Sequence, residues 1–282
     1  MTTIPNLHRA HHVAYDARAV ADRRERSVVV IVPTLDEAQT IEATVAALVA
    51  LRRAGVLDRV LVADASADDT PRLAERAGAE VVRQWELHGE LGAVLGKGDA
   101  MWRAASICGE DVLCFVDGDS ADFAERMPLA LIGATAVDGH GFAKATYARP
   151  FLDTNGHRPT GGGRVTELAA KPLLAMLLPE LAAFGQPLAG EIAVDATLLR
   201  ALPLATEYAV DVALLIDVWR TVGLGGMVEV DLGTRQNRHK PLGQLAPMAG
   251  QVAAAILHRA GRWDPGATLP FVERPPLDAL AR

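Results

Sequence analysis

Apolar residues in the first half of the chain form short continuous runs, and the segments between these runs have helical spacing. Continuous runs rich in branched side chains are typical of strands buried on both faces of a parallel sheet. The predicted strands cover residues 27–33, 59–64, 79–83 and 112–116. The predicted helices cover residues 37–53 and 68–78, and a further one follows the glycine-rich loop 88–98 and ends at Cys108. This alternation predicts an α/β fold with a mostly parallel, Rossmann-like sheet flanked by helices.

The second half of the chain is less regular and predicts a mixed arrangement of strands and helices. Strands are expected at 142–150 and 226–233, and helices at 160–181, 208–223 and 247–261. No internal repeat, low-complexity segment or disordered linker divides the chain. We therefore expect a single domain over residues 27–261, with an N-terminal arm at 1–26 that is polar and partly helical and a C-terminal tail at 262–282.

Composition limits the classes of protein to which this chain can belong. Its 282 residues are 50% apolar and carry a net charge of −7, which argues against non-specific binding of nucleic acid. No apolar run approaches the roughly 18 residues needed to span a bilayer, and no signal segment opens the chain. We expect a cytoplasmic, soluble protein with no membrane partner, in which Cys108 and Cys114 are core residues.

The strand at 112–116 runs directly into two carboxylates, Asp117 and Asp119, separated by Gly118. Like charges this close repel one another, so a positive group is expected nearby. Three explanations compete: a surface turn, an aspartyl phosphatase of the haloacid dehalogenase type, and a divalent cation that bridges a nucleotide diphosphate. Mg²⁺ and Mn²⁺ favour one or two carboxylates together with phosphate oxygens, and such a cation would relieve the repulsion.

Other polar residues follow the neighbouring strands and are expected at the same edge of the sheet, because ligands of open parallel sheets bind outside the carboxyl ends of the strands. Asp36 and Glu37 follow the first strand, where they could also serve as helix caps. Asp64 and Ser66 follow the second strand and could hydrogen-bond a base or ribose. Lys97 lies between two glycines at a helix N-terminus, a position suited to an anion such as a phosphate.

These motifs together resemble the glycosyltransferases of the GT-A fold, in the group similar to family 2. The resembling motifs are PTLDE at 33–37, DASADDT at 64–70 and the Asp-x-Asp at 117–119. In the second half, GKGDAMWRA, TGGGRVTELAAKPLLAMLLPEL, QPLAGEIAV, YAVDVALLIDV and VDLGTRQNRHKPL resemble the glucosyl-3-phosphoglycerate synthase family and its mannosyl-transferring relatives. The resemblance runs in order from about residue 27 to residue 261.

The resemblance implies a retaining transfer of a hexose from a sugar nucleotide to 3-phosphoglycerate, with Mg²⁺ or Mn²⁺ as the cofactor and a homodimer as the assembly. It implies a nucleotide-sugar-binding half at 27–120 and an acceptor-binding half at 121–261. Donor-binding residues would be Pro33, Thr34, Leu35, Glu37, Asp64, Lys97, Asp117, Gly118, Asp119 and Arg235. Acceptor-binding residues would be Gly162, Gly163, Arg164, Thr166 and His239, and the residues acting in catalysis Asp119, Lys97, Arg235, Glu191 and Asp211.

The last loop departs from the family pattern, which reads Arg-x-His-x-Asn. Here Asn237 stands at the position of the metal-binding histidine and His239 at that of the asparagine. The metal site would therefore comprise Asp117, Asp119 and either His239 or Asn237, and the exchange also alters one acceptor contact. A transferase acting on another small acceptor, such as a nucleoside, thus stays open as an alternative. So does a sugar-nucleotide-binding module without catalysis, whereas a nucleotidyltransferase would show a glycine-rich loop after the first strand.

Overall fold

The computed structural model of the chain describes residues 7–120, 122–149, 151–153, 156–158, 162–235 and 241–280, of which 151–153 and 156–158 are described by their backbone alone. Within these residues, eight strands form one sheet in the order β1-β11-β6-β9-β5-β2-β3-β4, and two short two-stranded sheets pair β10 with β12 and β7 with β8. Every strand of the large sheet runs parallel to its neighbours except β9, which is antiparallel to both β5 and β6.

The strands are β1 (His8–His11), β2 (Val28–Thr34), β3 (Arg59–Asp64), β4 (Glu80–Arg83), β5 (Val112–Phe115), β6 (Phe142–Ala148), β7 (Phe151–Asp153), β8 (Gly156–Arg158), β9 (Ile192–Asp195), β10 (Leu204–Ala205), β11 (Met227–Thr234) and β12 (Glu273–Arg274). The helices are α1 (Ala17–Arg23), α2 (Ile41–Arg53), α3 (Thr70–Ala77), α4 (Gly96–Ser106), α5 (Arg126–Ile132), α6 (Lys171–Leu177), α7 (Ala196–Arg200), α8 (Val210–Val222) and α9 (Leu242–Arg259).

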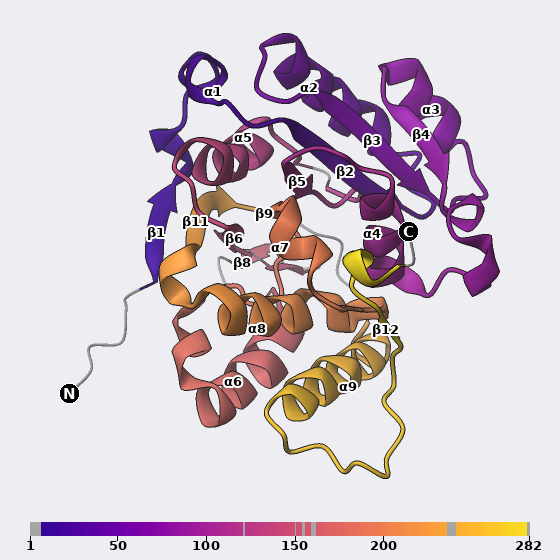
Figure 1. Ribbon diagram of the computed structural model, residues 1–282, viewed down its shortest axis with the longest axis vertical. Helices are drawn as coiled ribbons and strands as arrows, with labels where there is room; N and C mark the ends of the chain where they lie inside the picture. Colours follow the sequence, from indigo (N-terminus) through magenta and orange to yellow (C-terminus); the bar gives the residue numbers. More distant parts are fainter. Residues whose placement is uncertain are drawn as a thin grey trace.

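Helices cover both faces of the large sheet, which gives three layers (Figure 1). Alternate residues of β2 enter different cores: Val28 and Val30 pack with α2, α3 and α5, whereas Val29 and Ile31 pack with α4, α6, α8 and α9. Burial on both faces explains why the strands read as continuous apolar runs in the sequence. Cys108 and Cys114 are buried free thiols, as expected.

The carboxyl ends of β2, β3 and β5 lie together at one edge of the sheet. In the parallel register Thr34 pairs with Asp64, and Ile31 pairs with Phe115, so the loops after these strands leave the sheet side by side. The antiparallel β9 comes next to β5 and places Glu191, just before its first residue, near the same edge. This edge is the one at which ligands bind in open α/β sheets.

The two ends of the chain are more closely joined to the fold than the sequence pattern indicated. The expected arm contributes β1, which pairs with β11 at one end of the sheet (Figure 1). The expected tail contributes β12, which pairs with β10. Among the described residues, no helix combines the length and the apolar character that crossing a bilayer requires.

Two helices have boundaries that differ from the expected ones. The helix expected from residue 37 begins at Ile41, because Asp36 has a positive φ of 57° and the backbone crosses the edge of the sheet before it coils. The last helix begins at Leu242 instead of Pro247, and the proline lies inside it. Its N-cap residue is Pro241, whose extended backbone starts the helix five residues earlier.

Candidate active site

A cavity of about 820 Å³ lies at the carboxyl ends of the central strands. Loops after β2 and β5 form one side, the first turn of α4 another, and the segment 162–166 with α8 and α9 the rest. Most of the candidate site residues line it: Pro33, Thr34, Leu35, Glu37, Lys97, Asp117, Gly118, Asp119, Gly162, Gly163, Arg164, Thr166, Asp211 and Arg235. The structure therefore brings the donor-binding and acceptor-binding candidates into one space.

Two positively charged side chains, Lys97 and Arg235, lie beside the carboxylate pair, where a positive group was expected. Lys97 Nζ donates to Asp117 Oδ1 at 2.8 Å and lies 3.5 Å from Asp211 Oδ1. Burial alone would raise the pKa of Asp117, but the charges of Lys97 and Arg235 hold it well below its usual range. Burial would likewise lower the pKa of Lys97, yet Asp117 and Asp211 raise it, so this ion pair stays charged near neutral pH.

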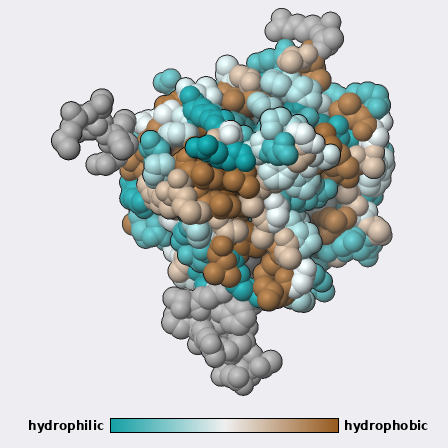
Figure 2. Space-filling view, turned by 90° about the horizontal axis from the view of Figure 1, so that it is seen from below, coloured by the Kyte–Doolittle hydropathy of each residue, from teal (hydrophilic) through white to brown (hydrophobic). Residues whose placement is uncertain are grey.

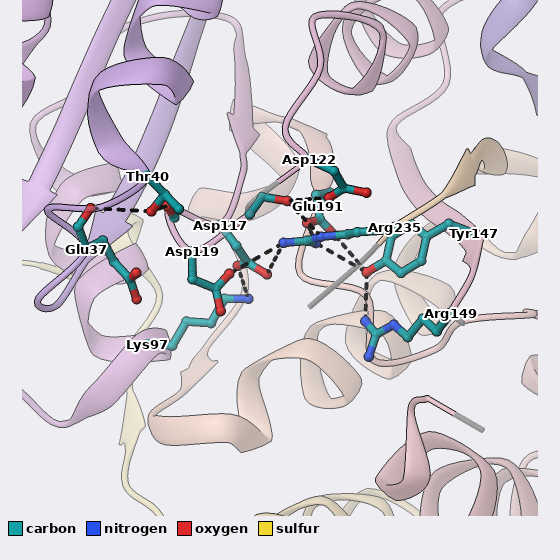
Figure 3. Close-up of polar contacts among 12 residues, drawn as sticks. Glu37, Thr40, Lys97, Asp117, Asp119, Asp122, Tyr147, Arg149, Glu191 and Arg235 are labelled. Carbon is teal, nitrogen blue, oxygen red and sulfur yellow. Dashed lines mark hydrogen bonds and ion pairs between the residues drawn. The ribbon is translucent and has the colours of Figure 1, made fainter. Parts of the chain in front are cut away.

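Arg235 is the second cation and lies between two groups of acceptors (Figure 3). On one side its Nη2 lies 3.4 Å from Asp117 Oδ2 and 3.6 Å from Asp119 Oδ1. On the other side it pairs with Glu191, and its guanidinium stands 5.6 Å from the centre of the Tyr147 ring. The guanidinium is almost fully buried, so these partners fix its orientation.

Glu191, a candidate for a residue acting in catalysis, lies beside Arg235. It is buried and does not line the cavity, since Arg235 stands between them. Its Oε2 accepts a hydrogen bond of 2.9 Å from the Tyr147 hydroxyl, and its other oxygen pairs with Arg235. In this structure Glu191 contacts Tyr147 and Arg235 and helps to orient the Arg235 guanidinium.

Asp64 also lies outside the cavity wall. Its carboxylate accepts a 2.9 Å hydrogen bond from the Thr34 hydroxyl, a 3.2 Å bond from the backbone N–H of Ser66, and pairs with Arg83. Asp64 thus joins the loops after β2 and β3 and holds Thr34 at the wall. Leu35 beside it is well exposed and offers an apolar surface at the cavity.

The segment that follows the glycine turn forms another part of the cavity wall. Gly162 N donates to the Arg149 carbonyl at 3.2 Å, and a Cβ on Gly162 would come within 2.8 Å of Arg149 Cβ, so only glycine fits without a shift. Gly163 has a φ of 71°, a conformation that side chains other than glycine rarely adopt. The turn presents Arg164 and Thr166 to the cavity.

A divalent ion needs oxygen ligands, and Asp117 and Asp119 provide carboxylates at the wall. Asp119 is the more exposed of the two side chains, 39% against 27%, while both oxygens of Asp117 face cations. No group of three or more His, Cys, Asp or Glu side chains able to hold a metal occurs in the described part of the chain. Asn237 and His239, the candidates for a further ligand and for an acceptor contact, lie outside the described residues.

Sequence reasoning missed Tyr147 and Arg149, which follow one another on the same side of β6 at its end. Arg149 lines the cavity, donates through Nη2 to the Tyr147 hydroxyl at 2.8 Å, and lies 5.0 Å from its ring centre. Because β6 and β5 are both antiparallel to β9, they point in the same direction, and the carboxyl end of β6 reaches the same edge as that of β5. Their position just after a strand, like that of Asp117 after β5, is the sequence signal that indicates both residues.

Comparisons with known proteins agree with this geometry. The model of the family Glycosyl transferase family 2 matches residues 29–160. Glucosyl-3-phosphoglycerate synthase from Mycolicibacterium smegmatis is 39% identical over 251 residues, which are 88% of this chain and 82% of that protein. The synthase of the same name from Mycobacterium tuberculosis is 39% identical over 254 residues, 88% of this chain and 78% of that protein.

Solved structures are similar over nearly the whole chain. Glucosyl-3-phosphoglycerate synthase from Mycobacterium tuberculosis, in complex with Mn²⁺, UDP and phosphoglyceric acid, has a TM-score of 0.87 and 33% identity and covers 98% of this chain and 99% of its own. Mannosyl-3-phosphoglycerate synthase from Rubrobacter xylanophilus has a TM-score of 0.86 and 36% identity, with 98% and 96% covered. Another structure of the tuberculosis protein holds Mg²⁺ and UDP. The expected GT-A fold is confirmed.

Proposed function

This chain belongs to the glucosyl-3-phosphoglycerate synthase family of glycosyltransferases, and on that premise we propose that it transfers glucose from UDP-glucose to the hydroxyl of 3-phosphoglycerate with Mg²⁺ or Mn²⁺. The observation that carries the proposal is a single cavity lined both by the cations and carboxylates and by the Arg164 turn. A donor diphosphate and an anionic acceptor would thus meet in the same space.

The first wall suits the nucleotide and its diphosphate. Pro33, Thr34 and Leu35 supply a mostly apolar surface for the base, and Glu37 and Gly118 complete it. Lys97 and Arg235 lie at the carboxylate pair, where they would contact the phosphates. Both are already held by Asp117, so little side-chain freedom remains to be lost when the donor binds.

The carboxylates fit a hard divalent ion. We assign Asp119 as the ligand of the ion and Asp117 as the residue that orients Lys97 and Arg235, because the latter carboxylate is already engaged by two cations. His239 and Asn237 stay candidates for a further ligand. A bound Mg²⁺ or Mn²⁺ would supply Lewis-acid stabilisation of the charge that develops on the leaving diphosphate.

The acceptor would bind at the turn 162–166. The N–H of Gly163, the guanidinium of Arg164 and the hydroxyl of Thr166 are suited to a phosphate or carboxylate, because arginine donates two parallel hydrogen bonds to such groups. Arg149 borders this turn and adds positive charge. The acceptor hydroxyl would then face the sugar from the same side as the diphosphate.

Retention of configuration follows if the acceptor attacks from the side of the leaving group. Glu191 is buried behind Arg235 and has both oxygens engaged, so it is poorly placed to act as a nucleophile. Lys97 and Arg235 would stabilise the diphosphate in the transition state, and a phosphate oxygen would accept the acceptor's proton. Asp211, whose pKa burial raises, would shape the pocket beside Lys97.

The proposal is tested by incubating the protein with UDP-glucose, 3-phosphoglycerate and Mn²⁺ and measuring UDP release and the phosphorylated product. GDP-mannose, UDP-mannose and GDP-glucose identify the sugar and the base, and nucleosides and glycerol phosphates test other acceptors. Fast UDP release that requires 3-phosphoglycerate supports the proposal. Turnover only with a different acceptor, or tight UDP binding without turnover, contradicts it.

We further propose a cytoplasmic homodimer, with no role for nucleic acid or membranes. Leu168, in the helical turn before α6, and Met176, near the end of α6, are 75% and 70% exposed, and Pro172 between them is exposed as well. Figure 2 views the side of the molecule on which α6 lies, and apolar residues gather there. Sedimentation should give a dimer that Met176→Glu converts to a monomer, and a monomeric wild type contradicts this assembly.

A further inference from the structure

The first turn of α4, which carries Lys97, is held by a buried carboxylate two residues further on. Asp99 is fully buried, and its Oδ2 accepts a 2.9 Å hydrogen bond from the backbone N–H of Leu95, the residue before the helix. The two carboxylate oxygens also accept hydrogen bonds from Arg274 Nε and Nη2, at 2.7 and 2.8 Å. A bidentate pair of this kind fixes direction as well as distance.

Arg274 belongs to the C-terminal segment, 175 positions away in the sequence. Figure 1 shows β12 and the end of the chain against α4. The Trp102 indole N–H donates to the Pro275 carbonyl at 2.7 Å, and the Arg274 guanidinium lies 5.9 Å from the Trp102 ring centre. The segment after Arg259 is therefore attached to α4 at two successive turns of the helix.

The first turn of α4 is also packed tightly against β10 and the residues that follow it. A Cβ on Gly98 would come within 2.0 Å of the Ala205 carbonyl oxygen, so the helix backbone touches β10. Glu207 N donates to the Leu95 carbonyl at 3.0 Å. Since β12 pairs with β10, the same small sheet touches the first turn of α4 twice, through Ala205 and through Arg274.

We propose that Arg274 is a positioning residue for donor binding: by holding Asp99, it fixes the first turn of α4 and thereby places the Lys97 ammonium against the donor diphosphate. The C-terminal tail is then part of the donor site, although Arg274 does not touch the donor. This inference rests on the donor role proposed above for Lys97.

Removing the guanidinium leaves a buried carboxylate with one remaining cation, Arg103, whose Nε lies 3.3 Å from Asp99 Oδ1. A buried charge that loses a partner reorients or admits water, because its desolvation is no longer compensated. Asp99 would turn toward Arg103 and release the N–H of Leu95, and the first turn would shift. A displacement of about 1 Å in a positioned group can reduce activity by roughly a hundredfold.

The test compares Arg274→Met with Arg259→Met in the full-length protein. Arg259 is a matched control: it is equally buried, at 7% exposure, and donates at 2.8 Å to both Asp217 and Glu273, but it contacts α8 and β12 and not α4. Calorimetry with UDP and Mn²⁺ should give a Kd raised roughly tenfold for Arg274→Met and unchanged for Arg259→Met, although both variants lose thermal stability. The KM for 3-phosphoglycerate should stay unchanged in both.

A double-mutant cycle with Lys97→Met identifies the route of the effect. If Arg274 acts through Lys97, adding Arg274→Met to Lys97→Met weakens UDP binding no further. If Lys97→Met binds UDP as tightly as the wild type, the donor role of Lys97 itself is refuted. If Lys97→Met binds UDP more weakly but Arg274→Met binds it normally, only the positioning role of Arg274 is refuted. If Arg274→Met does not fold, Arg274→Lys can replace it, because lysine keeps the charge and one bond to Asp99. Its Kd for UDP should lie between those of the wild type and of Lys97→Met, and a Kd equal to that of the wild type overturns the inference.

Discussion

Gly190 leaves open the space that the Lys97 ammonium occupies: a Cβ on this glycine would lie 2.0 Å from Lys97 Nζ. The same Cβ would lie 2.8 and 3.0 Å from the two carboxylate oxygens of Asp117. Gly190 is not among the residues with positive φ, so the glycine is required by the ion pair beside it and not by its own backbone. The short loop before β9 is thus shaped to admit the Lys97–Asp117 pair.

We expect Gly190→Ala to move Lys97 away from Asp117 and to lower kcat/KM for UDP-glucose roughly ten- to hundredfold. The fold should persist, because the displaced atom is the end of a flexible side chain. Steady-state kinetics with a melting curve would test this. Gly109→Ala is the control, since a Cβ there meets nothing within 4 Å, and it should behave as wild type. Unchanged kinetics in Gly190→Ala would contradict the close fit described here.

Much of the site was predictable because its residues follow parallel strands. Asp117, Asp119 and Thr34 all come after continuous apolar runs, and the parallel sheet brings these runs to one edge. The lysine between glycines was predictable in the same local way, since α4 begins beside it. Such inferences need only the alternation of strands and helices along the chain, which predicts parallel strands with their carboxyl ends at one edge.

Relationships between distant segments were not predictable from these patterns. Nothing local indicates that Arg235 stands between Glu191 and the cavity, because that depends on the packing of three separate strands. The short strand β12 has only two residues, too few for a periodic signal, so the sequence pattern places it in a tail. β9 was missed because four residues next to a glycine turn resemble a loop.

Replacing Asp119 tests the metal assignment. Asp119→Asn keeps the shape of the side chain but removes the charge that a divalent ion requires. The rate of transfer should fall at least about a hundredfold, because a bound metal stabilises the transition state by several kcal/mol. In calorimetry, Mn²⁺ should no longer strengthen the binding of UDP. Glu125→Gln, an exposed acid at the start of α5, is the control. Manganese-dependent UDP binding that survives in Asp119→Asn would remove this residue from the metal site.

Replacing Arg164 tests the acceptor wall. Arg164→Met should raise the KM for 3-phosphoglycerate roughly ten- to hundredfold, as expected for the loss of charge-assisted hydrogen bonds, and should leave the Kd for UDP unchanged. Arg18→Met, at an exposed position in α1, provides a control for the loss of one positive charge. An acceptor KM equal to that of the wild type would show that the anion binds elsewhere in the cavity.

Lys144 is a buried lysine in β6, directly behind the site. Its ammonium donates to the Ala189 carbonyl at 2.7 Å, and burial lowers its pKa from 10.5 to about 8. Asp211, Asp117 and Glu229 favour the charged form, while Lys97 opposes it. The lysine is therefore charged at neutral pH but loses its proton at a lower pH than it does in the unfolded chain.

This difference makes stability depend on pH in a defined window. Between about pH 8 and 10.5 the unfolded chain holds a proton on Lys144 that the folded protein has released, so the lysine's contribution to the free energy of unfolding rises with pH. A shift from 10.5 to about 8 corresponds to about 3 kcal/mol across the window. Urea unfolding of the wild type and Lys144→Met at pH 7, 8.5 and 10 should show the wild type gaining relative to the variant. Lys171→Met, which replaces a partly exposed lysine on α6, should show no such trend. Parallel curves for Lys144→Met and the wild type would mean that Lys144 titrates alike in the folded and unfolded states.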